Sequence, residues 1–517
     1  LISFLVLSQV VLMSVTPKQD PTILVVLICL GIFFINLPKR YSFPYVTLML
    51  FGMAFLIVIG RLPVRGGISA LLTAAAAGII LIFIRDQIVY KTVDLNQKNR
   101  QLAQKNTIIE KTYTELKTLK EKQDGDYYLT SVLLTPLSRN LAETEAYTIE
   151  IYGEQFKKFK FRDREGEIGG DLVSVRDFKL YDRPFTVVIN GDAMGKSIQG
   201  AGGALVLGSV FHSRVNRTRS SSRAERIYPE QWLREAFLEL QQTFESFHGS
   251  MMASIFIGLL DEQTGLLYYI NAEHPYPVIV RNGEATFFAE NQPIRKIGFP
   301  GNLANFGIGT KQLQPNDIIV IGSDGRDDLE ILDNSTERKI NSDEYQFLEV
   351  IKKTNGSIAE TVTSLRNLGN VIDDLSLISI QCNRFEGLNQ QLPFNQTKSK
   401  IQQLMNSGSY GMAANQTKEL SWMYPTEEEL LFVASRCFKK SFETEERKEE
   451  YLLEAADFGE RLRLRNSNHR KNLVNLADTY RLLRNYKRGI EIADAALQIN
   501  PTDETTKKLI DFMSERI

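Results

Sequence analysis

The sequence contains few of the residues that build several common sites. Its 517 residues include three cysteines and four histidines, and both are scattered along the chain. This spacing argues against a disulfide framework and against a zinc cluster of Cys and His, and it fits a reducing compartment. The net charge is -1. Charge of one sign is therefore not in excess, so we expect no nucleic-acid partner.

A glycine is missing where a nucleotide-binding loop needs one. The stretch "VVINGDAMGKS" (187–197) ends in Gly-Lys-Ser, as a P-loop does, but the position five before Gly195 is Asn190. Asp192 would also bring a negative charge into a loop that holds phosphate. A nucleotide-driven kinase or ATPase, which predicts ATP binding through Lys196, is therefore disfavoured.

Long apolar runs are abundant, but only near the start of the chain. They cover 1–15, 22–37, 43–60 and 67–84. Because a membrane span takes about 20 apolar residues, we expect residues 1–85 to form a membrane domain of four segments. Buried core helices or a signal peptide are the alternatives. The chain starts without Met inside an apolar run, so we expect an upstream part to be missing.

Residues 86–122 form a predicted coiled-coil connector. Residues 91–122 hold eight Lys or Arg against four Asp or Glu, which favours the cytoplasmic side of a membrane. An apolar residue recurs every seventh position: Ile88, Leu95, Leu102, Ile109 and Leu116. Asn99 and Asn106 then occupy position a, which favours a parallel dimer. A single solvated helix is the alternative.

Short strands dominate residues 128–386. The apolar runs "FTVVIN", "SIFIGLLD", "GLLYYINA", "DIIVIGSD" and "LSLISIQC" read as strands, and "YPVIV" and "ATFFA" flank the hairpin signal "RNGE". Helical patterns cover 201–214, 229–246 and 357–370. This mixture predicts a layered fold of sheets and helices.

Acidic residues lie at the ends of these strands and at glycine-rich turns. They are Asp171, Asp192, Asp324 and the pair Asp373-Asp374. An Asp in a turn is most often a cap, so each one alone is weak evidence. Together, clustered carboxylates would repel one another, and hard divalent cations prefer such oxygen ligands. Two cations can activate a water and hold a phosphoryl oxygen.

Five segments in order complete the pattern: "EIGGDLVSV", "VVINGDAMGKS", "FIGLLDEQTGLLYYINAEHPYPVIV", "LQPNDIIVIGSDG" and "VIDDLSLISI". They resemble the bacterial SpoIIE/RsbU-like branch of the metal-dependent (PPM-type) Ser/Thr protein phosphatases, over about 260 residues. The resemblance implies a β-sandwich flanked by helices (α-β-β-α) and two Mn²⁺ or Mg²⁺ ions.

The resemblance also implies the roles of individual residues. Asp192 would bridge both metals, and the backbone carbonyl of Ala193 would add a ligand. Asp171 would reach one metal, partly through water, while Asp324 and Asp373 would hold the other face. A metal-activated water would then hydrolyse phosphoserine or phosphothreonine.

The sequence departs from the family pattern at three places. Ser197 replaces the last glycine of Asp-x-x-Gly-x-Gly, Glu273 replaces the glycine of Asn-Ala-Gly-His, and Met194 stands where eukaryotic members carry a proton-donating His. None of these changes removes an implied metal ligand, so an active enzyme is favoured. We expect His274 to be a core residue and Lys196 to be solvated.

The last part of the chain reads as helical repeats. Residues 388–400 form a polar linker, and 485–504 match the second helix of a tetratricopeptide repeat. Residues 409–428 repeat this frame, 427–464 read as a further helix pair, and 503–516 as a capping helix. We expect residues 401–517 to be an all-α tetratricopeptide-like domain that docks a protein partner; an unrelated helical bundle is the alternative.

The sequence as a whole predicts a multidomain signalling phosphatase. It would be a multi-pass protein of the bacterial inner membrane, dimeric through its coiled coil, with phosphatase and repeats in the cytoplasm. The family often acts on phosphorylated anti-sigma-factor antagonists, so the resemblance implies such a substrate. The rival hypothesis is a catalytically inactive membrane scaffold whose phosphatase-like domain only binds a phosphoprotein.

Overall fold

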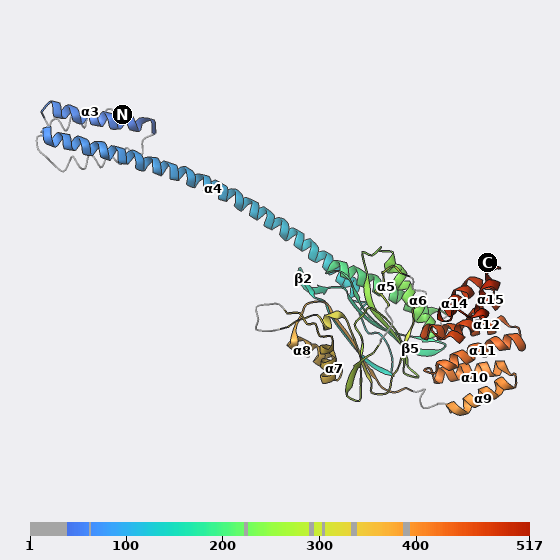
Figure 1. Ribbon diagram of the computed structural model, residues 1–517. Coiled ribbons are helices and arrows are strands. Elements are labelled where there is room, and N and C mark those ends of the chain that lie inside the picture. The colour runs from blue at the N-terminus through green and yellow to red at the C-terminus, as the bar shows by residue number, and fades with distance from the viewer. Residues whose placement is uncertain are drawn as a thin grey trace. The chain divides into compact units, whose positions relative to one another are not determined.

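The computed structural model describes residues 39–60, 64–221, 226–288, 294–301, 306–331, 339–385 and 393–517. The chain divides into two compact units, Leu1–Leu119 and Lys120–Ile517. The first unit contains helix α3 (Lys39–Val58) and most of helix α4 (Val64–Leu134). The second contains the sheets and the C-terminal helices (Figure 1).

The multi-pass membrane localisation predicted from the sequence is wrong. Two of the four predicted segments, 1–15 and 22–37, lie outside the described residues. The other two fall in α3 and α4, and none of the helices in the described ranges is both long enough and apolar enough to cross a bilayer. Helix α3 begins with Lys39 and Arg40 and contains Pro44, and α4 continues from its apolar part directly into the charged connector.

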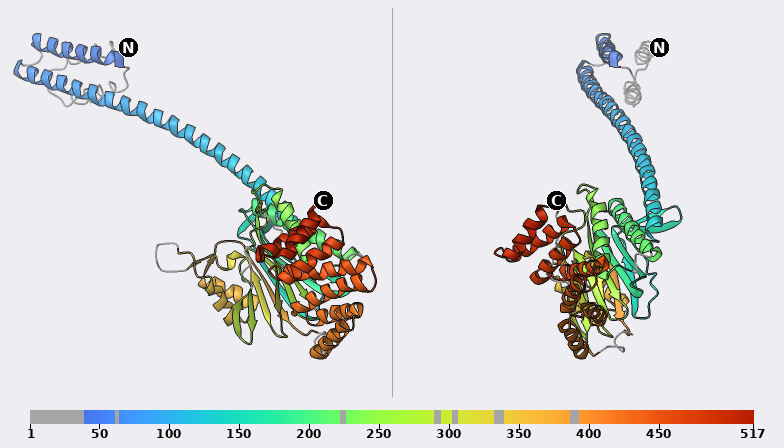
Figure 2. Two further views of the ribbon diagram at one scale, coloured as in Figure 1. Left: turned by 45° about the vertical axis from the view of Figure 1, so that its right-hand side comes forward. Right: turned by 90° about the vertical axis from the view of Figure 1, so that its right-hand side faces the viewer.

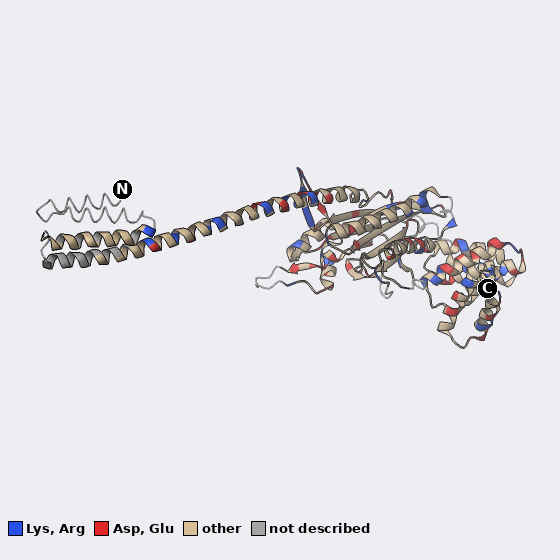
Figure 3. Cartoon of the chain, turned by 90° about the horizontal axis from the view of Figure 1, so that it is seen from above, with Lys and Arg blue, Asp and Glu red and all other residues tan. Residues whose placement is uncertain are grey.

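The predicted connector, residues 86–122, is helical throughout as part of α4. Its seven-residue apolar series is exposed in the single chain, from Ile88 at 47% to Leu116 at 60%. Basic residues, with fewer acidic ones among them, are spread along this part of the helix (Figure 3). Pairing with a second chain through this series stays a prediction.

Two five-stranded antiparallel sheets form the centre of the second unit. The first, in the order β10-β7-β6-β5-β4, consists of β4 (Asp171–Leu180), β5 (Arg183–Ala193), β6 (Ala253–Asp261), β7 (Leu266–Ala272) and β10 (Gly309–Gln312). The second, in the order β1-β14-β11-β8-β9, consists of β1 (Tyr147–Glu154), β8 (Val278–Arg281), β9 (Glu284–Phe287), β11 (Ile318–Gly322) and β14 (Leu375–Cys382). Two hairpins, β2 (Lys157–Phe161) with β3 (Arg164–Ile168) and β12 (Leu329–Ile331) with β13 (Gly369–Val371), lie outside these sheets.

The alternation of side chains along each strand builds three apolar layers. On β5, Val187 and Ile189 join a core with the helices, whereas Val188 joins the core between the two sheets. On β14, Ile378 packs between the sheets and Leu377 packs outward. This follows from the two-residue period of a strand, which places neighbours on opposite faces.

Helices cover the outer face of each sheet (Figure 1). Helices α5 (Ile198–Ser220) and α6 (Pro229–Glu245) pack on the first sheet, and α7 (Tyr345–Thr354) and α8 (Ile358–Leu368) pack on the second. The α-β-β-α architecture predicted for this domain is therefore confirmed. Helix α7 was not predicted. The "RNGE" hairpin was: it joins β8 to β9 through Asn282 (φ 55°) and Gly283 (φ 82°).

Seven helices follow the sheets in the described residues: α9 (Phe394–Asn406), α10 (Tyr410–Met423), α11 (Glu428–Thr444), α12 (Glu449–Arg465), α13 (Arg470–Leu482), α14 (Tyr486–Ile499) and α15 (Glu504–Ser514). Consecutive helices pack against each other and form a stack beside the sheets (Figure 2). A helical C-terminal region is thus confirmed, and its assignment to tetratricopeptide repeats stays a prediction. Part of the predicted linker, 394–400, lies in α9.

These helices share a core with the phosphatase-like layers. Tyr228, at the start of α6, stacks on Trp422 of α10 with ring centroids 5.6 Å apart, and it contacts Phe458 of α12. The backbone N–H of Ile308 donates to the carbonyl of Leu464 at 2.7 Å. The C-terminal helices are therefore packed on the first sheet's helical layer.

Candidate metal centre

Two of the predicted ligands stand opposite each other on neighbouring strands. Asp171 is the first residue of β4 and Asp192 lies near the end of β5, and the antiparallel register pairs them directly. Asp171 is buried, and hydrogen bonding by the hydroxyls of Ser323 and Ser376 only partly offsets the rise in its pKa that burial and Asp192 cause. A buried carboxylate beside a second one is costly, and a bound cation would lower that cost.

Three further aspartates meet at the same end of the second sheet. Asp324 opens a 3₁₀ turn, η2 (Asp324–Arg326), directly after β11, and Asp373 precedes β14. The turn brings Asp328 back beside them, because the N–H of Asp328 donates to the carbonyl of Asp324 at 2.9 Å. One carboxylate oxygen from each of Asp324, Asp328 and Asp373 lies within 4.8 Å of the others.

The two groups of aspartates influence each other electrostatically. Burial, followed by the charge of Asp324, raises the pKa of Asp192 to about 7. Burial, followed by Asp373, raises the pKa of Asp324 to about 6. Burial and then Asp192 raise the pKa of Asp171 well above its ordinary value. Carboxylates from both sheets therefore form one repulsive centre, which bound divalent cations would neutralise.

Asp374 ties the two sheets together beside this centre. Its carboxylate accepts hydrogen bonds from the backbone N–H of Phe156 at 2.7 Å and of Gly170 at 2.6 Å. A Cβ on Gly169 would lie 2.2 Å from this carboxylate, and one on Gly170 would lie 2.3 Å from the carbonyl oxygen of Ala193. Asp374 is thus a positioning residue that fixes the loop before Asp171.

The glycines of the predicted site are needed mainly because neighbouring atoms leave no room for a Cβ atom. A positive φ is a less common reason among them. Only Gly195, at φ 117°, has a positive φ among Gly169, Gly170, Gly195 and Gly325. A Cβ on Gly325 would lie 2.0 Å from the carbonyl of Asp374. Close packing, and not a positive φ, is therefore what requires glycine at Gly169, Gly170 and Gly325.

A series of buried, hydrogen-bonded polar side chains lies beside the aspartates. The two ring nitrogens of His274 contact the Ser254 hydroxyl at 3.0 Å and the Asn190 side-chain oxygen at 2.6 Å. The amide of Asn190 donates to the hydroxyl of Ser376 on the other sheet at 2.9 Å. Burial, followed by Arg326, lowers the pKa of His274 to about 3. The neutral, fully engaged imidazole fits the core role expected for it.

A lysine in the described part of the chain acts electrostatically on these carboxylates. The charge of Lys296, in the segment before β10, lowers the pKa values of both Asp192 and Asp324 against the effect of burial. Lys196, by contrast, is exposed in the loop between β5 and α5. Asp192 lies in β5, and the Gly-Lys-Ser segment that follows connects this strand to helix α5.

The comparison with protein families decides what this arrangement is. Residues 184–383 match the family model of Stage II sporulation protein E (SpoIIE). The central region is a SpoIIE-type phosphatase domain. The resemblance seen in the sequence is confirmed over these residues, and the chain contains a metal-dependent protein phosphatase domain.

Solved structures of similar proteins come from several bacteria. The RsbU and RsbW domains of a Mycobacterium tuberculosis protein share 16% identity, with a TM-score of 0.36 over 58% of this chain and 75% of that one. The PP2C phosphatase domain with a regulatory fragment of SpoIIE from Bacillus subtilis shares 13% identity, with a TM-score of 0.35 over 46% and 64%. The SiaA-PP2C domain of Pseudomonas aeruginosa shares 14% identity, with a TM-score of 0.37 over 52% and 98%. No curated protein matches the chain.

Two residues of this SpoIIE-type centre were not predicted. Asp328 could have been suspected from the acid-rich run "GSDGRDD", but its place depends on the turn that follows β11. Lys296 gives no signal in the sequence, because only the fold brings its segment to the strand ends. The predicted Asp171, Asp192, Asp324 and Asp373 all lie at this end of the two sheets.

Proposed function

We propose that this chain is a signalling phosphatase that hydrolyses phosphoserine or phosphothreonine on a regulatory protein with the help of two divalent cations. The observation that carries the proposal is the convergence of five aspartates from both sheets, with the carboxylate of Asp171 buried opposite Asp192. Such a donor set, made only of oxygens, suits Mn²⁺ or Mg²⁺.

The residues present fit these cations. Asp171, Asp192 and the carbonyl of Ala193 would hold them from the first sheet, and Asp324 and Asp373 from the second, with Asp328 as a further ligand. When bound, the cations would supply an activated water and neutralise charge on the phosphoryl group. The absence of Cβ atoms at Gly169 and Gly170 lets the loop lie against the carbonyl of Ala193.

The protein's own side chains divide the remaining work. Asp374 holds the loop before Asp171 through two backbone N–H groups. Lys296 brings a positive charge to the rim of the centre, where it would attract and orient the substrate phosphate. His274 cannot protonate the leaving group, because both its ring nitrogens are engaged below the site.

The substrate class follows from the family resemblance. We propose a phosphorylated regulatory protein, with an anti-sigma-factor antagonist as the form that the resemblance implies. We further propose that the chain acts as a dimer through residues 86–122 and that the helical C-terminal region binds a protein partner. The first is supported by the exposed seven-residue series of α4.

The experiment that tests this function uses the full chain with a phosphoserine peptide and, separately, a generic aryl phosphate. We expect hydrolysis of both to require Mn²⁺ or Mg²⁺ and to be lost in Asp324→Asn. The matched control is Asp163→Asn, an exposed acid on the β2–β3 hairpin. Binding of the phosphopeptide without metal-dependent turnover would instead support the inactive scaffold.

A further inference from the structure

Three of the C-terminal helices, α11, α13 and α15, line a groove of about 580 Å³. The residues that line it recur at intervals of three or four positions, as Phe432, Arg436 and Lys439 do on α11. This spacing places them on one face of their helix. The volume falls within the range of about 300–1,000 Å³ that is usual for ligand sites. The aspartates of the metal centre do not line this groove.

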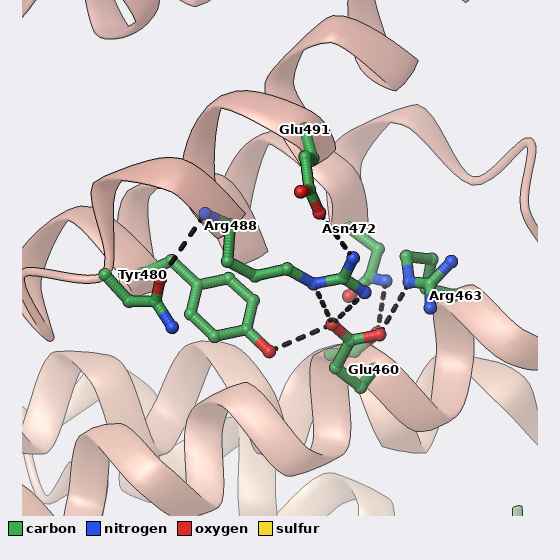
Figure 4. Close-up of polar contacts among 8 residues, drawn as sticks. Glu460, Arg463, Asn472, Tyr480, Arg488 and Glu491 are labelled. Carbon is green, nitrogen blue, oxygen red and sulfur yellow. Dashed lines mark hydrogen bonds and ion pairs between the residues drawn. The ribbon is translucent and has the colours of Figure 1, made fainter. Parts of the chain in front are cut away.

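Hydrogen bonds fix the helices that form the groove. The side-chain amide of Asn475 on α13 donates to the hydroxyl of Ser435 on α11 at 3.0 Å. Glu460 of α12 accepts hydrogen bonds from the hydroxyl of Tyr480 on α13 at 2.9 Å and from Arg488 on α14 at 2.8 Å (Figure 4). The groove is therefore formed before a partner arrives, which lowers the conformational cost of binding.

The groove carries an excess of positive charge. Among the described residues that line it, five are Lys or Arg and one is acidic, whereas the whole chain has 61 basic and 62 acidic residues. The acidic one, Asp478, already pairs with Lys439 and with Arg481, both at 2.7 Å. Because like charges gathered on one face repel one another, a ligand of opposite charge is favoured here.

Three of the cations are accessible to a ligand. Arg436, Lys471 and Lys508 are exposed, one on each helix, and none of them forms an ion pair within the described part of the chain. Phe512 of α15 lines the same groove and is 39% exposed, and Val474 of α13 is half-buried there. The groove thus offers both positive charge and apolar surface.

We propose that this groove binds an acidic segment of a protein partner. Carboxylates of the segment pair with Arg436, Lys471 and Lys508, and one apolar side chain packs on Phe512. A groove encloses a narrow ligand, such as a single extended or helical segment, which favours a polypeptide over a membrane surface. The inference rests on the proposed function, because it specifies which kind of protein the C-terminal helices bind.

Fluorescence anisotropy of a labelled peptide tests this binding on the full chain. The peptide is short, rich in Glu and has one central Leu, and the matched control peptide has Gln in place of every Glu. We expect saturable binding of the Glu peptide and no binding of the Gln peptide. Binding should weaken as the salt concentration rises from about 0.1 M to about 1 M, because screening shortens the range of charge attraction from about 10 Å to about 3 Å.

Variants locate the binding. Lys471→Glu reverses a charge in the groove and should weaken binding of the Glu peptide about ten-fold. Lys487→Glu changes an exposed lysine of α14 that does not line the groove, and it should bind as the native chain does. Phe512→Ala should weaken binding of the Leu peptide but not of a peptide with Ser in its place. Equal affinities of the Lys471→Glu and Lys487→Glu variants would overturn the proposal.

Two other anionic ligands are tested alongside, vesicles of phosphatidylglycerol and a short DNA duplex. Binding of either one in a manner that Lys471→Glu abolishes, without binding of the Glu peptide, would also overturn the proposal. Peptide binding is measured without metal, so its outcome does not depend on phosphatase activity. A chain that hydrolyses the phosphoserine peptide but does not bind the Glu peptide would contradict this inference alone.

Discussion

Two regions of the second unit bury charged groups in opposite ways. The metal centre gathers carboxylates, and their burial and mutual repulsion raise the pKa values of Asp192 and Asp324. The contact between α6 and α12 buries Glu230 at 0% exposure between Arg461 and Arg465. Burial alone would raise the pKa of Glu230, yet the two arginines lower it below its ordinary value.

The difference shows what each region is built for. Where the chain leaves like charges uncompensated, opposite charge must come from outside, and we propose that divalent cations supply it. Where it supplies the opposite charge itself, the buried group serves to hold two parts of the structure in one arrangement. Removing a charge should therefore affect chemistry in the first region and stability in the second.

The largest effect should come from Asp192→Asn. The amide keeps the size of the side chain but removes the charge that the cations need, so metal-dependent phosphatase activity of the full chain should fall on the order of 10³-fold. The unfolding midpoint in urea, measured without added metal, should not fall, because burying an amide is less costly than burying a carboxylate. Activity close to that of the native chain would remove Asp192 from the centre.

Glu230→Gln should produce the converse result. It leaves Arg461 and Arg465 buried without their counter-charge, so the free energy of unfolding should fall by about 3 kcal/mol. The control is Glu239→Gln, because Glu239 pairs with the exposed Arg217 and such surface pairs contribute less than about 1 kcal/mol. Urea unfolding of both variants measures the difference. Equal losses would show that burial of the pair is unimportant.

Lys296→Gln tests the positive charge that lowers the pKa values of Asp192 and Asp324. We expect KM for a phosphopeptide to rise about ten-fold, equivalent to ~1.4 kcal/mol, with a smaller change in kcat. Lys196→Gln is the matched control, since Lys196 is exposed in a nearby loop. Steady-state kinetics at fixed Mn²⁺ separates the two parameters. A larger effect from Lys196→Gln would reverse the assignment.

The smallest effect concerns Asp457, an acid within the contact between α6 and α12. Glu454, Glu460, Arg461 and Lys418 act on it, and its folded pKa of about 7 exceeds the unfolded value of about 3.9. The folded state thus binds the extra proton, and the stability that this contributes is present below about pH 4 and lost as pH rises through 7.

Asp457→Asn should remove this dependence on pH. Relative to the native chain, the variant should gain a few tenths to about 1 kcal/mol between pH 5 and pH 8, after allowance for solvent screening. Taking the difference between the two proteins cancels the titration of the metal centre. Parallel stability curves for native and variant chains would contradict the raised pKa.

Much of the phosphatase domain could be predicted from the sequence, because its signals are local. The strand from 185 to 190, the Asn282-Gly283 turn and the acids at strand ends all depend on neighbouring residues. Asp171 and Asp192 could be expected to meet once both were placed at strand ends. Their identity as ligands came from the family resemblance, since an Asp in a turn is usually a cap.

The rest depends on packing between distant segments. Helix α7 is short and lies against β8 and β9, and Lys296 reaches the metal centre only through the fold. The buried contact of Glu230 with Arg461 joins residues more than two hundred positions apart. The prediction from the apolar runs near the start failed for a different reason. It used hydrophobicity alone and gave membrane spans that the described helices do not support.

The core that α6 shares with the C-terminal helices limits where the protein can be truncated. A fragment that stops near residue 390 would present Tyr228 and neighbouring apolar side chains to water and leave Glu230 without its arginines. Such a truncation should be prone to aggregate. The phosphatase domain of this chain is therefore a poor candidate for exchange as an independent module between proteins, and gene fusions that keep it should also keep the helices that follow.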